Sequence, residues 1–325
     1  MALRAVLPTE LRRLSSFMSS ALATDDGVVA SVLPEPLLQG ALASWRRLLP
    51  SLFWFGGRVR IYAEAQRGRT GATALLYAGR RPEWVVLLLA AGPGPECADA
   101  AFMLLSGVSA LAARSGMQRI FAGVPDRGGA RETFFQAGFY SYTRETWFVA
   151  SAPPAPPRHG VARIAHSRDA HDLFRLYVAT TPHAVQRAEQ LAIEDFDGRR
   201  RAGAFDPPHV GGNPLAMRRQ MLVIVDDERR PSACAISYRG ADRHPHVCKV
   251  RTVDGEVDLA RELVRRVAHP LRADRPVAVP VRSYEEHVAR ALALEGFSEA
   301  ATAMLFVKEL AVRIEEPAFA PAVVR

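Results

Sequence analysis

Apolar and polar positions along the first 150 residues predict helices and strands in a definite order. The segment 83–92, EWVVLLLAAG, is apolar on both sides, which predicts a buried strand at the centre of a sheet. Apolar residues at every third or fourth position then predict a long helix that ends at Gly116. In full, the predicted elements are helix 9–23, strands 59–66, 70–79 and 83–92, helix 99–115, strand 118–124, helix 130–137 and strand 145–150.

The second half of the chain repeats this order. Its predicted elements are strand 162–165, helices from 169 and over 185–195, strands 221–227, 232–240 and 246–253, helix 258–269, strand 276–281, helix 285–294 and strand 303–310. The Gly-, Pro- and Arg-rich stretch 197–216 is longer than an ordinary connection, and we interpret it as a lid or a mobile loop.

Both halves also end in the same way. A short amphipathic helix stops at Gly138-Phe139 in the first half and at Gly296-Phe297 in the second, and each stop precedes a strand. The two glycines are 158 residues apart. Between the halves, SAPPAPPRHG (151–160) predicts an exposed, extended linker. We therefore expect two domains of like topology, 1–150 and 161–325, joined by the Pro-rich linker 151–160.

Composition narrows the class of protein. Apolar residues make up 49% of the 325 and charged residues 23%, as in a globular protein with sizeable cores. The net charge of +8 comes from arginines that are scattered along the chain, and only Lys249 and Lys308 are lysines. This distribution does not favour a nucleic-acid surface. Three widely spaced cysteines and the lack of a signal-like start lead us to expect a cytoplasmic protein without disulfides, metal site or membrane anchor.

The order of elements and the Gly-Phe endings resemble the Gcn5-related N-acetyltransferases (GNAT), a family of acyl-CoA N-acyltransferases. The resemblance covers both halves. It implies an α+β fold with αβα layers, in which the sheet is mixed and mostly antiparallel, present as two tandem domains. It also implies acetyl-CoA or another acyl-CoA as cofactor, with pantetheine along the main chain of strand 83–92 or 246–253.

In that family a loop resembling Gln/Arg-x-x-Gly-x-Gly/Ala precedes the long helix and holds the pyrophosphate through backbone N–H groups. Counting from the helices places the loop at 96–101 and 255–260, so Asp99 and Asp258 occupy the first glycine position and are expected to cap their own helices. A competing register, 89–94, keeps two glycines. The cofactor-binding candidates are Ala91, Gly92, Gly94, Asp99 and Ala101 in the first half and Val253, Gly255, Asp258 and Ala260 in the second.

The family's usual catalytic acid is a Tyr four residues before the Gly of Gly-Phe. Phe134 and Leu292 occupy those positions, and neither can donate a proton. Tyr284, just past strand 276–281, and Tyr142, on the strand after Gly138-Phe139, are the substitute candidates.

Two functions remain open from the sequence. The resemblance implies an N-acyltransferase whose acceptor is a small-molecule amine or a protein N-terminus. The departures from the family pattern instead favour a non-catalytic tandem protein that binds a ligand or another protein.

Overall fold

The structure is a computed structural model of the 325-residue chain. It describes residues 4–22, 27–31, 59–66, 69–78, 81–126, 129–152, 154–157, 162–197, 218–225, 230–240, 245–253, 255–271 and 275–311. Most of the predicted loop 197–216 lies outside these residues.

The element order repeats in the two halves, as the sequence predicts. The first half contains β1 (Arg4–Ala5), η1 (Pro8–Glu10), α1 (Leu11–Leu22), β2 (Gly27–Ser31), β3 (Val59–Gln66), β4 (Arg69–Ala78), β5 (Glu83–Pro93), α4 (Pro95–Arg114), β6 (Arg119–Pro125), α5 (Ala130–Gln136) and β7 (Tyr140–Ala150). The second contains β8 (Ala162–Ile164), η2 (Ser167–Asp169), α6 (Ala170–Thr180), α7 (His183–Glu189), η3 (Ile193–Phe196), β9 (Arg218–Val225), β10 (Pro231–Arg239), β11 (His246–Thr252), α8 (Val257–Ala268), β12 (Val277–Arg282), α9 (Glu286–Leu294) and β13 (Ser298–Glu309).

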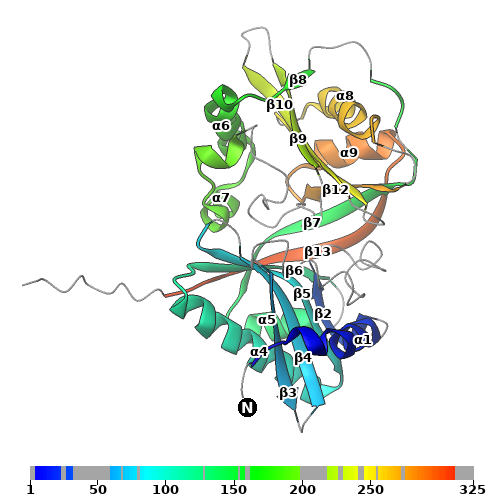
Figure 1. Cartoon of the computed structure of the whole chain (residues 1–325). Coiled ribbons are helices and arrows are strands. Elements are labelled where there is room, and N and C mark those ends of the chain that lie inside the picture. Colours follow the sequence, from blue (N-terminus) through cyan, green and yellow to red (C-terminus); the bar gives the residue numbers. More distant parts are fainter. Residues whose placement is uncertain are drawn as a thin grey trace, which may run out of the picture.

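The described strands form one continuous mixed sheet in which the halves exchange their last strands (Figure 1). The order is β1-β3-β4-β5-β6-β13-β7-β12-β11-β10-β9-β8, and β2 also pairs with β5. The final strand of the second half, β13, pairs antiparallel with β6 of the first, whereas β7 of the first half pairs antiparallel with β12 of the second. The two exchanged strands pair with each other at the centre of the sheet.

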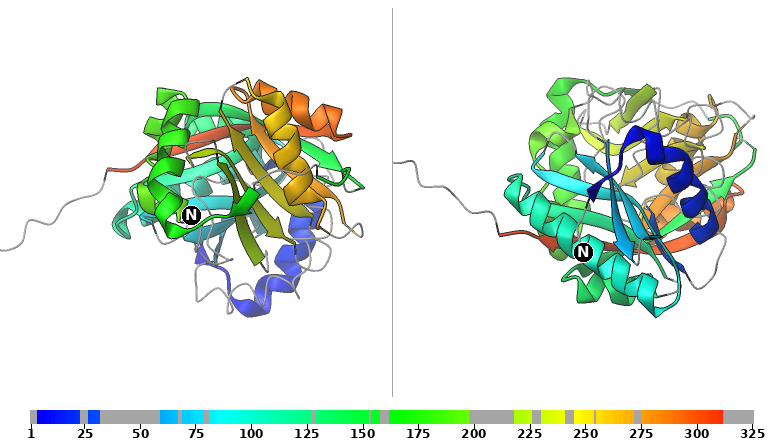
Figure 2. Two further views of the ribbon diagram at one scale, coloured as in Figure 1. Left: turned by 90° about the horizontal axis from the view of Figure 1, so that it is seen from above. Right: turned by 60° about the horizontal axis from the view of Figure 1, so that its bottom comes forward.

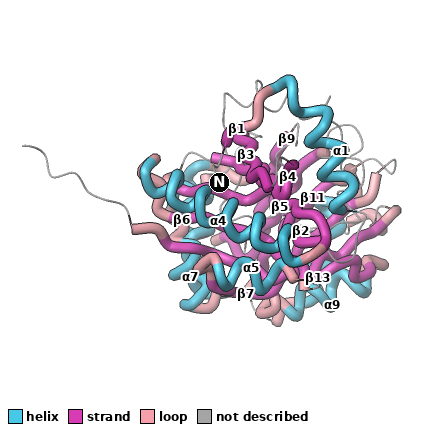
Figure 3. The backbone as a smooth tube through the Cα atoms, turned by 90° about the horizontal axis from the view of Figure 1, so that it is seen from below, coloured by secondary structure: helices cyan, strands magenta, loops and turns pink. Residues whose placement is uncertain are grey.

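Helices cover both faces of the sheet in each half. In the second half, α8 and α9 pack on one face and α6 on the other, as the view from above in Figure 2 shows. In the first half, α4 and α5 share one core while α1 packs on the opposite face (Figure 3). By length and composition α4 could cross a membrane, but it buries Leu104, Leu105 and Val108 against the sheet.

The exchange places an aromatic residue of each half in the core of the other. Phe306 of β13 is fully buried in the cluster beneath α4 and α5, and Phe148 of β7 is buried in the cluster beneath α8 and α9. Lys308 of β13 adds a polar contact, because its ammonium donates to the Ala137 carbonyl of the first half at 2.6 Å. The two cores are therefore completed only in the whole chain.

The Gly-Phe repeat is a pair of equivalent helix stops. Gly138 and Gly296 have φ of 80° and 82°, a conformation in which a Cβ would be strained. The N–H of Phe139 donates to the Phe134 carbonyl and that of Phe297 to the Leu292 carbonyl, both at 3.0 Å. Each Phe then turns into its core, so one motif ends the helix and starts the strand in both halves.

The described part of the Pro-rich linker, 151–152 and 154–157, contains no strand. The expectation that it is exposed throughout is wrong at one residue. Pro154 is buried, and its carbonyl lies 3.1 Å from Nδ1 of His269 at the end of α8.

Candidate functional site

The main chain of β5 is closed on both edges. Residues Glu83–Val86 pair in parallel with β6, and the following stretch Leu88–Pro93 pairs antiparallel with β2. The pairing with β2 runs from Ser31 opposite Leu88 to Gly27 opposite Pro93, and the Ser31 hydroxyl donates to the Leu87 carbonyl at 3.2 Å. With β4 on the other side, this strand has no edge left for a ligand's amide groups.

The equivalent strand of the second half, β11, is open. It pairs with β10 from Val247 to Thr252, but its parallel pairing with β12 covers only His246 and Val247. From Cys248 to Thr252, no other described strand pairs with its second edge. The two strands separate there, so β11 presents unpaired main-chain groups to the space between them.

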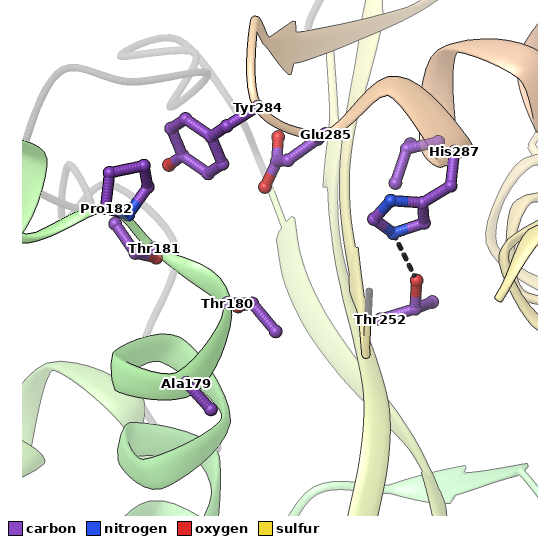
Figure 4. A pocket seen from close by; sticks show the side chains of 9 residues that line it. Ala179, Thr180, Thr181, Pro182, Thr252, Tyr284, Glu285 and His287 are labelled. Carbon is purple, nitrogen blue, oxygen red and sulfur yellow. Dashed lines mark hydrogen bonds between the residues drawn. The ribbon is translucent and has the colours of Figure 1, made fainter. Parts of the chain in front are cut away.

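A cavity of about 270 Å³ lies at the open end of β11 (Figure 4). Three segments far apart in the sequence form its walls: the α6–α7 turn, the end of β11 and the β12–α9 connection. The lining residues are Ala179, Thr180, Thr181, Pro182, Thr252, Tyr284, Glu285, His287 and Val288.

Arg251 holds these walls together. Its guanidinium Nη1 donates to the hydroxyls of Thr180 and Thr181, both at 2.8 Å, and Nη2 lies 3.7 Å from the Glu285 carboxylate. Glu285 in turn accepts the backbone N–H of Arg282 at 3.0 Å. Because every partner is buried or nearly so, this network fixes the turn after α6 relative to β11 and β12.

Two side chains of the cavity can transfer protons. His287 Nε2 lies 2.8 Å from the Thr252 hydroxyl, which orients the ring toward the end of β11. Tyr284 points toward Pro182 across the cavity (Figure 4). Burial, and then the Glu285 carboxylate, raise the pKa of Tyr284 to about 12, so its hydroxyl stays protonated at neutral pH.

The expected helix capping by Asp99 and Asp258 is wrong. Helix α4 begins at Pro95 with Gly94 as N-cap, so Asp99 lies in its second turn. Counting from the helix places the loop at 96–101, but these residues already belong to α4, and Pro95 suits its first helical position. Asp258 lies near the start of α8, but its exposed carboxylate contacts Arg261 at 3.3 Å and caps no N–H group. The competing register ending at Gly94 therefore fits the helix start of the first half.

The other cofactor-binding candidates differ in whether they are buried or exposed. Ala101 and Ala260 are fully buried in the helix cores, and Ala91 is fully buried in β5. Gly92 is also buried, so its backbone faces the protein. Of the first-half candidates, Gly94 lies in the exposed loop, where Pro93 and Pro95 on either side supply no N–H group.

In the second half, Val253 is 37% exposed, and Gly255 has a φ of 80° with open space around it. Both lie between β11 and α8, next to the cavity residue Thr252. Tyr142, by contrast, is not a lining residue of this cavity. Its hydroxyl is buried near Arg282, and burial raises the pKa of Tyr142 well above its ordinary value.

The sequence patterns do not identify Thr252, Glu285 and His287 as site residues. Glu285 and His287 follow directly after a buried strand, and polar residues at the carboxyl end of such a strand are a signal for a binding site. Thr252 carries no such signal, because its position depends on where β11 and β12 separate.

Comparison with known proteins gives the class of fold. No known family model matches the sequence, and no curated protein matches it. The structure, however, is similar to a GCN5-related N-acetyltransferase from Sphaerobacter thermophilus, with a TM-score of 0.58, 13% identity and 97% of each chain covered.

It is also similar to a tandem GNAT protein from the clavulanic acid biosynthesis pathway, with a TM-score of 0.55, 13% identity, and coverage of 95% of this chain and 98% of that one. The chain therefore has the fold of the GNAT acetyltransferases, in the tandem form with two acyl-CoA N-acyltransferase-like halves. At this identity the likeness concerns the fold, and the activity has to be argued from the site.

Proposed function

We propose that the second half binds an acyl-CoA along the open edge of β11 and transfers the acyl group to an amine. The observation that carries this proposal is the separation of β11 from β12 beside the 270 Å³ cavity. The corresponding edge in the first half is occupied by β2. The acceptor is a small-molecule amine or a protein N-terminus, and the setting we propose is cytoplasmic.

The residues present fit the acyl end of such a ligand better than its phosphates. Unpaired main-chain groups of β11 are suited to amide groups of pantetheine, and the cavity gives room for an acyl group and an amine. Near the start of α8, however, Glu256 and Asp258 place negative charge beside the loop at Gly255. Since like charges repel, we expect modest affinity for the pyrophosphate.

Acyl-CoA would supply the activated thioester, and side chains of the cavity would accept and donate the protons. His287, oriented by Thr252, is placed to accept the proton of the amine. Tyr284 is protonated and can donate to the leaving thiolate. Arg251 and Glu285 hold the cavity in shape and are positioning residues.

The test is titration calorimetry with acetyl-CoA on wild type and two tryptophan variants. Ala179 lines the cavity, and Val178 beside it is exposed but does not line it. We expect Ala179→Trp to weaken binding about tenfold or more by filling the cavity, and Val178→Trp to bind as wild type. Equal binding by both variants would place the ligand elsewhere.

Release of free thiol from acetyl-CoA with a panel of amines then separates transfer from binding. We expect Tyr284→Phe to keep its affinity and to lose about 100-fold in rate, within the usual range for an acid catalyst. Binding without any thiol release would instead support the second function, a ligand-binding protein. The buried Leu292, at the position where the family usually has its acid, favours that alternative.

A further inference from the structure

Lys249 lies at the point where β11 and β12, the two central strands of the second half, separate. The last residue pair between β11 and β12 is Val247 with Ala278, so Lys249 is two residues beyond it. Side chains alternate along a strand, and Cys248 and Val250 pack beneath α8 and α9. Lys249 therefore faces the opposite side, together with Arg251.

On that side Lys249 lines a second, smaller cavity of about 50 Å³, beneath α6 and η3. The walls are largely apolar, with Phe196, Met221 and Ile236 among them. The same cavity contains Arg251, whose guanidinium also contacts the walls of the larger cavity. Arg251 thus connects the two cavities, and the Lys249 side chain, two residues earlier on the same strand, starts from the opening between β11 and β12.

The amine of Lys249 is not engaged by its neighbours. Within the described residues it makes no hydrogen bond and no ion pair. The nearby carboxylates have other partners: Glu145 lies 3.0 Å from Arg282 Nε, and Glu189 accepts the Tyr177 hydroxyl at 2.8 Å. The charged groups that act on Lys249 are Arg251 of β11, Arg282 of β12, Glu145 of β7, Glu189 of α7 and Glu285 before α9. Asp195 of η3 also lines the small cavity, and its carboxylate pairs with Arg81 at 2.9 Å.

Burial, and then the Arg282 charge, lower the pKa of Lys249 below its ordinary value. The neutral amine is therefore more populated than in an exposed lysine, and the neutral form is the nucleophile. Lys308, the only other lysine in the sequence, is committed to the Ala137 carbonyl on another part of the sheet.

We propose that Lys249 is itself acylated by the acyl-CoA bound along β11. The amine nitrogen attacks the thioester carbonyl, a C–N bond forms and the C–S bond breaks. The proton lost by the nitrogen goes to the leaving thiolate, so no further reactant is needed. The products are an amide at Lys249 and free coenzyme A. This inference rests on the proposed function, because it requires the thioester to lie at the opening between β11 and β12.

The reaction removes one positive charge from a buried cluster that has three cations, Lys249, Arg251 and Arg282, facing three carboxylates. It also places the acyl group beside the small cavity. Because an amide is stable, the modification is a single event per chain, and it alters the proposed site from within.

The experiment uses the full chain incubated with acetyl-CoA and no added amine, followed by intact mass and peptide mapping. We expect one acetyl group on the peptide that contains Lys249. Lys249→Arg keeps the charge but has no neutral amine near neutral pH, so it should reduce labelling to background. Lys308→Arg is the matched control and should be labelled as wild type.

Acetyl-CoA binding is measured on the same samples. Binding without an adduct at Lys249 would overturn this inference and leave the proposed function standing, whereas absence of binding would overturn both. Labelling of Lys308 to the same extent, or equal labelling of the heat-unfolded chain, would show unselective chemistry and would also overturn the inference.

Discussion

Glu295 shows how a single carboxylate can join two helices. It follows the end of α9 and accepts hydrogen bonds from Arg261 Nε at 2.9 Å and Arg265 Nε at 2.7 Å, both on α8. Its side chain is only 3% exposed. Although burial opposes the effect, the bonds from Arg265 and then Arg261 hold the pKa of Glu295 below its ordinary value.

We predict that Glu295→Gln lowers the free energy of unfolding at pH 7 by about 1–2 kcal/mol, because charged hydrogen bonds become neutral ones. A carboxylate with a lowered pKa stabilises the fold above its unfolded pKa, and this stabilisation is lost as pH falls through the folded pKa. The free energies of unfolding of wild type and variant should therefore become equal below about pH 4. Urea unfolding between pH 3 and 7 measures this.

Glu262→Gln is the matched control for that change. Glu262 pairs with Arg266 one turn away on the same helix, α8. We expect Glu262→Gln to lower the free energy of unfolding by no more than about 0.5 kcal/mol. If Glu262→Gln lowered the free energy of unfolding as much as Glu295→Gln does, the contact of Glu295 with α8 would contribute no extra stability.

The roles of individual residues are the feature that the sequence predicts least well. Counting from the long helix places the pyrophosphate loop at 96–101, whereas these residues belong to α4, whose first residue is Pro95. Tyr284 was found from its place after a strand, but its neighbours Glu285 and His287 were not. The position of Thr252 depends on the local separation of two strands, which no short sequence pattern encodes.

At the scale of single elements, β2 distinguishes the two halves. Its five residues, GVVAS, pair along the part of β5 that corresponds to the open edge of β11. No periodicity in so short a segment predicts a strand, and the sequence analysis did not include one there. Most of the other helices and strands agree with their predicted ranges to within a few residues, because their apolar periods are long. The sequence pattern does not predict β1, and β7 and β13 begin five residues before their predicted starts, at Tyr140 and Ser298.

We predict one acyl-CoA site per chain, since β2 closes the edge of β5. Calorimetry should give a stoichiometry of one, and Ala179→Trp should leave no second site of similar affinity. Two equivalent sites, or a site that survives in the variant, would show that the pairing of β2 does not exclude the ligand from the first half.

At the scale of the whole molecule, the exchanged strands β7 and β13 make the halves interdependent. The sequence patterns predict the same order of elements in both halves, and the structure agrees. The patterns do not identify the neighbour of each last strand, because the pairing of β7 with β12 and of β13 with β6 depends on contacts between the halves. The domain boundaries at 150 and 161 thus remain a prediction about sequence segments rather than about separate folding units.

We predict that fragments 1–157 and 158–325 do not fold when produced alone, because each lacks a central strand of its sheet and an aromatic residue of its core. Produced together, they should associate and recover the circular dichroism of the intact chain. Phe306→Ala in the full chain should cost about 3–5 kcal/mol, as for other buried aromatic residues. A cooperatively unfolding, monomeric fragment 1–157 would contradict this interdependence.

The placement of β13 also bears on how the protein is made. Domains generally fold as they leave the ribosome, starting from the N-terminus. Here the strand that fills the middle of the sheet, Ser298–Glu309, is synthesised after every other described strand. The edge of β6 and the core around Phe134 therefore stay uncovered until β13 has been synthesised. A prematurely terminated chain would expose apolar surface in both halves at once, so quality-control chaperones and proteases would have a clear signal by which to remove it.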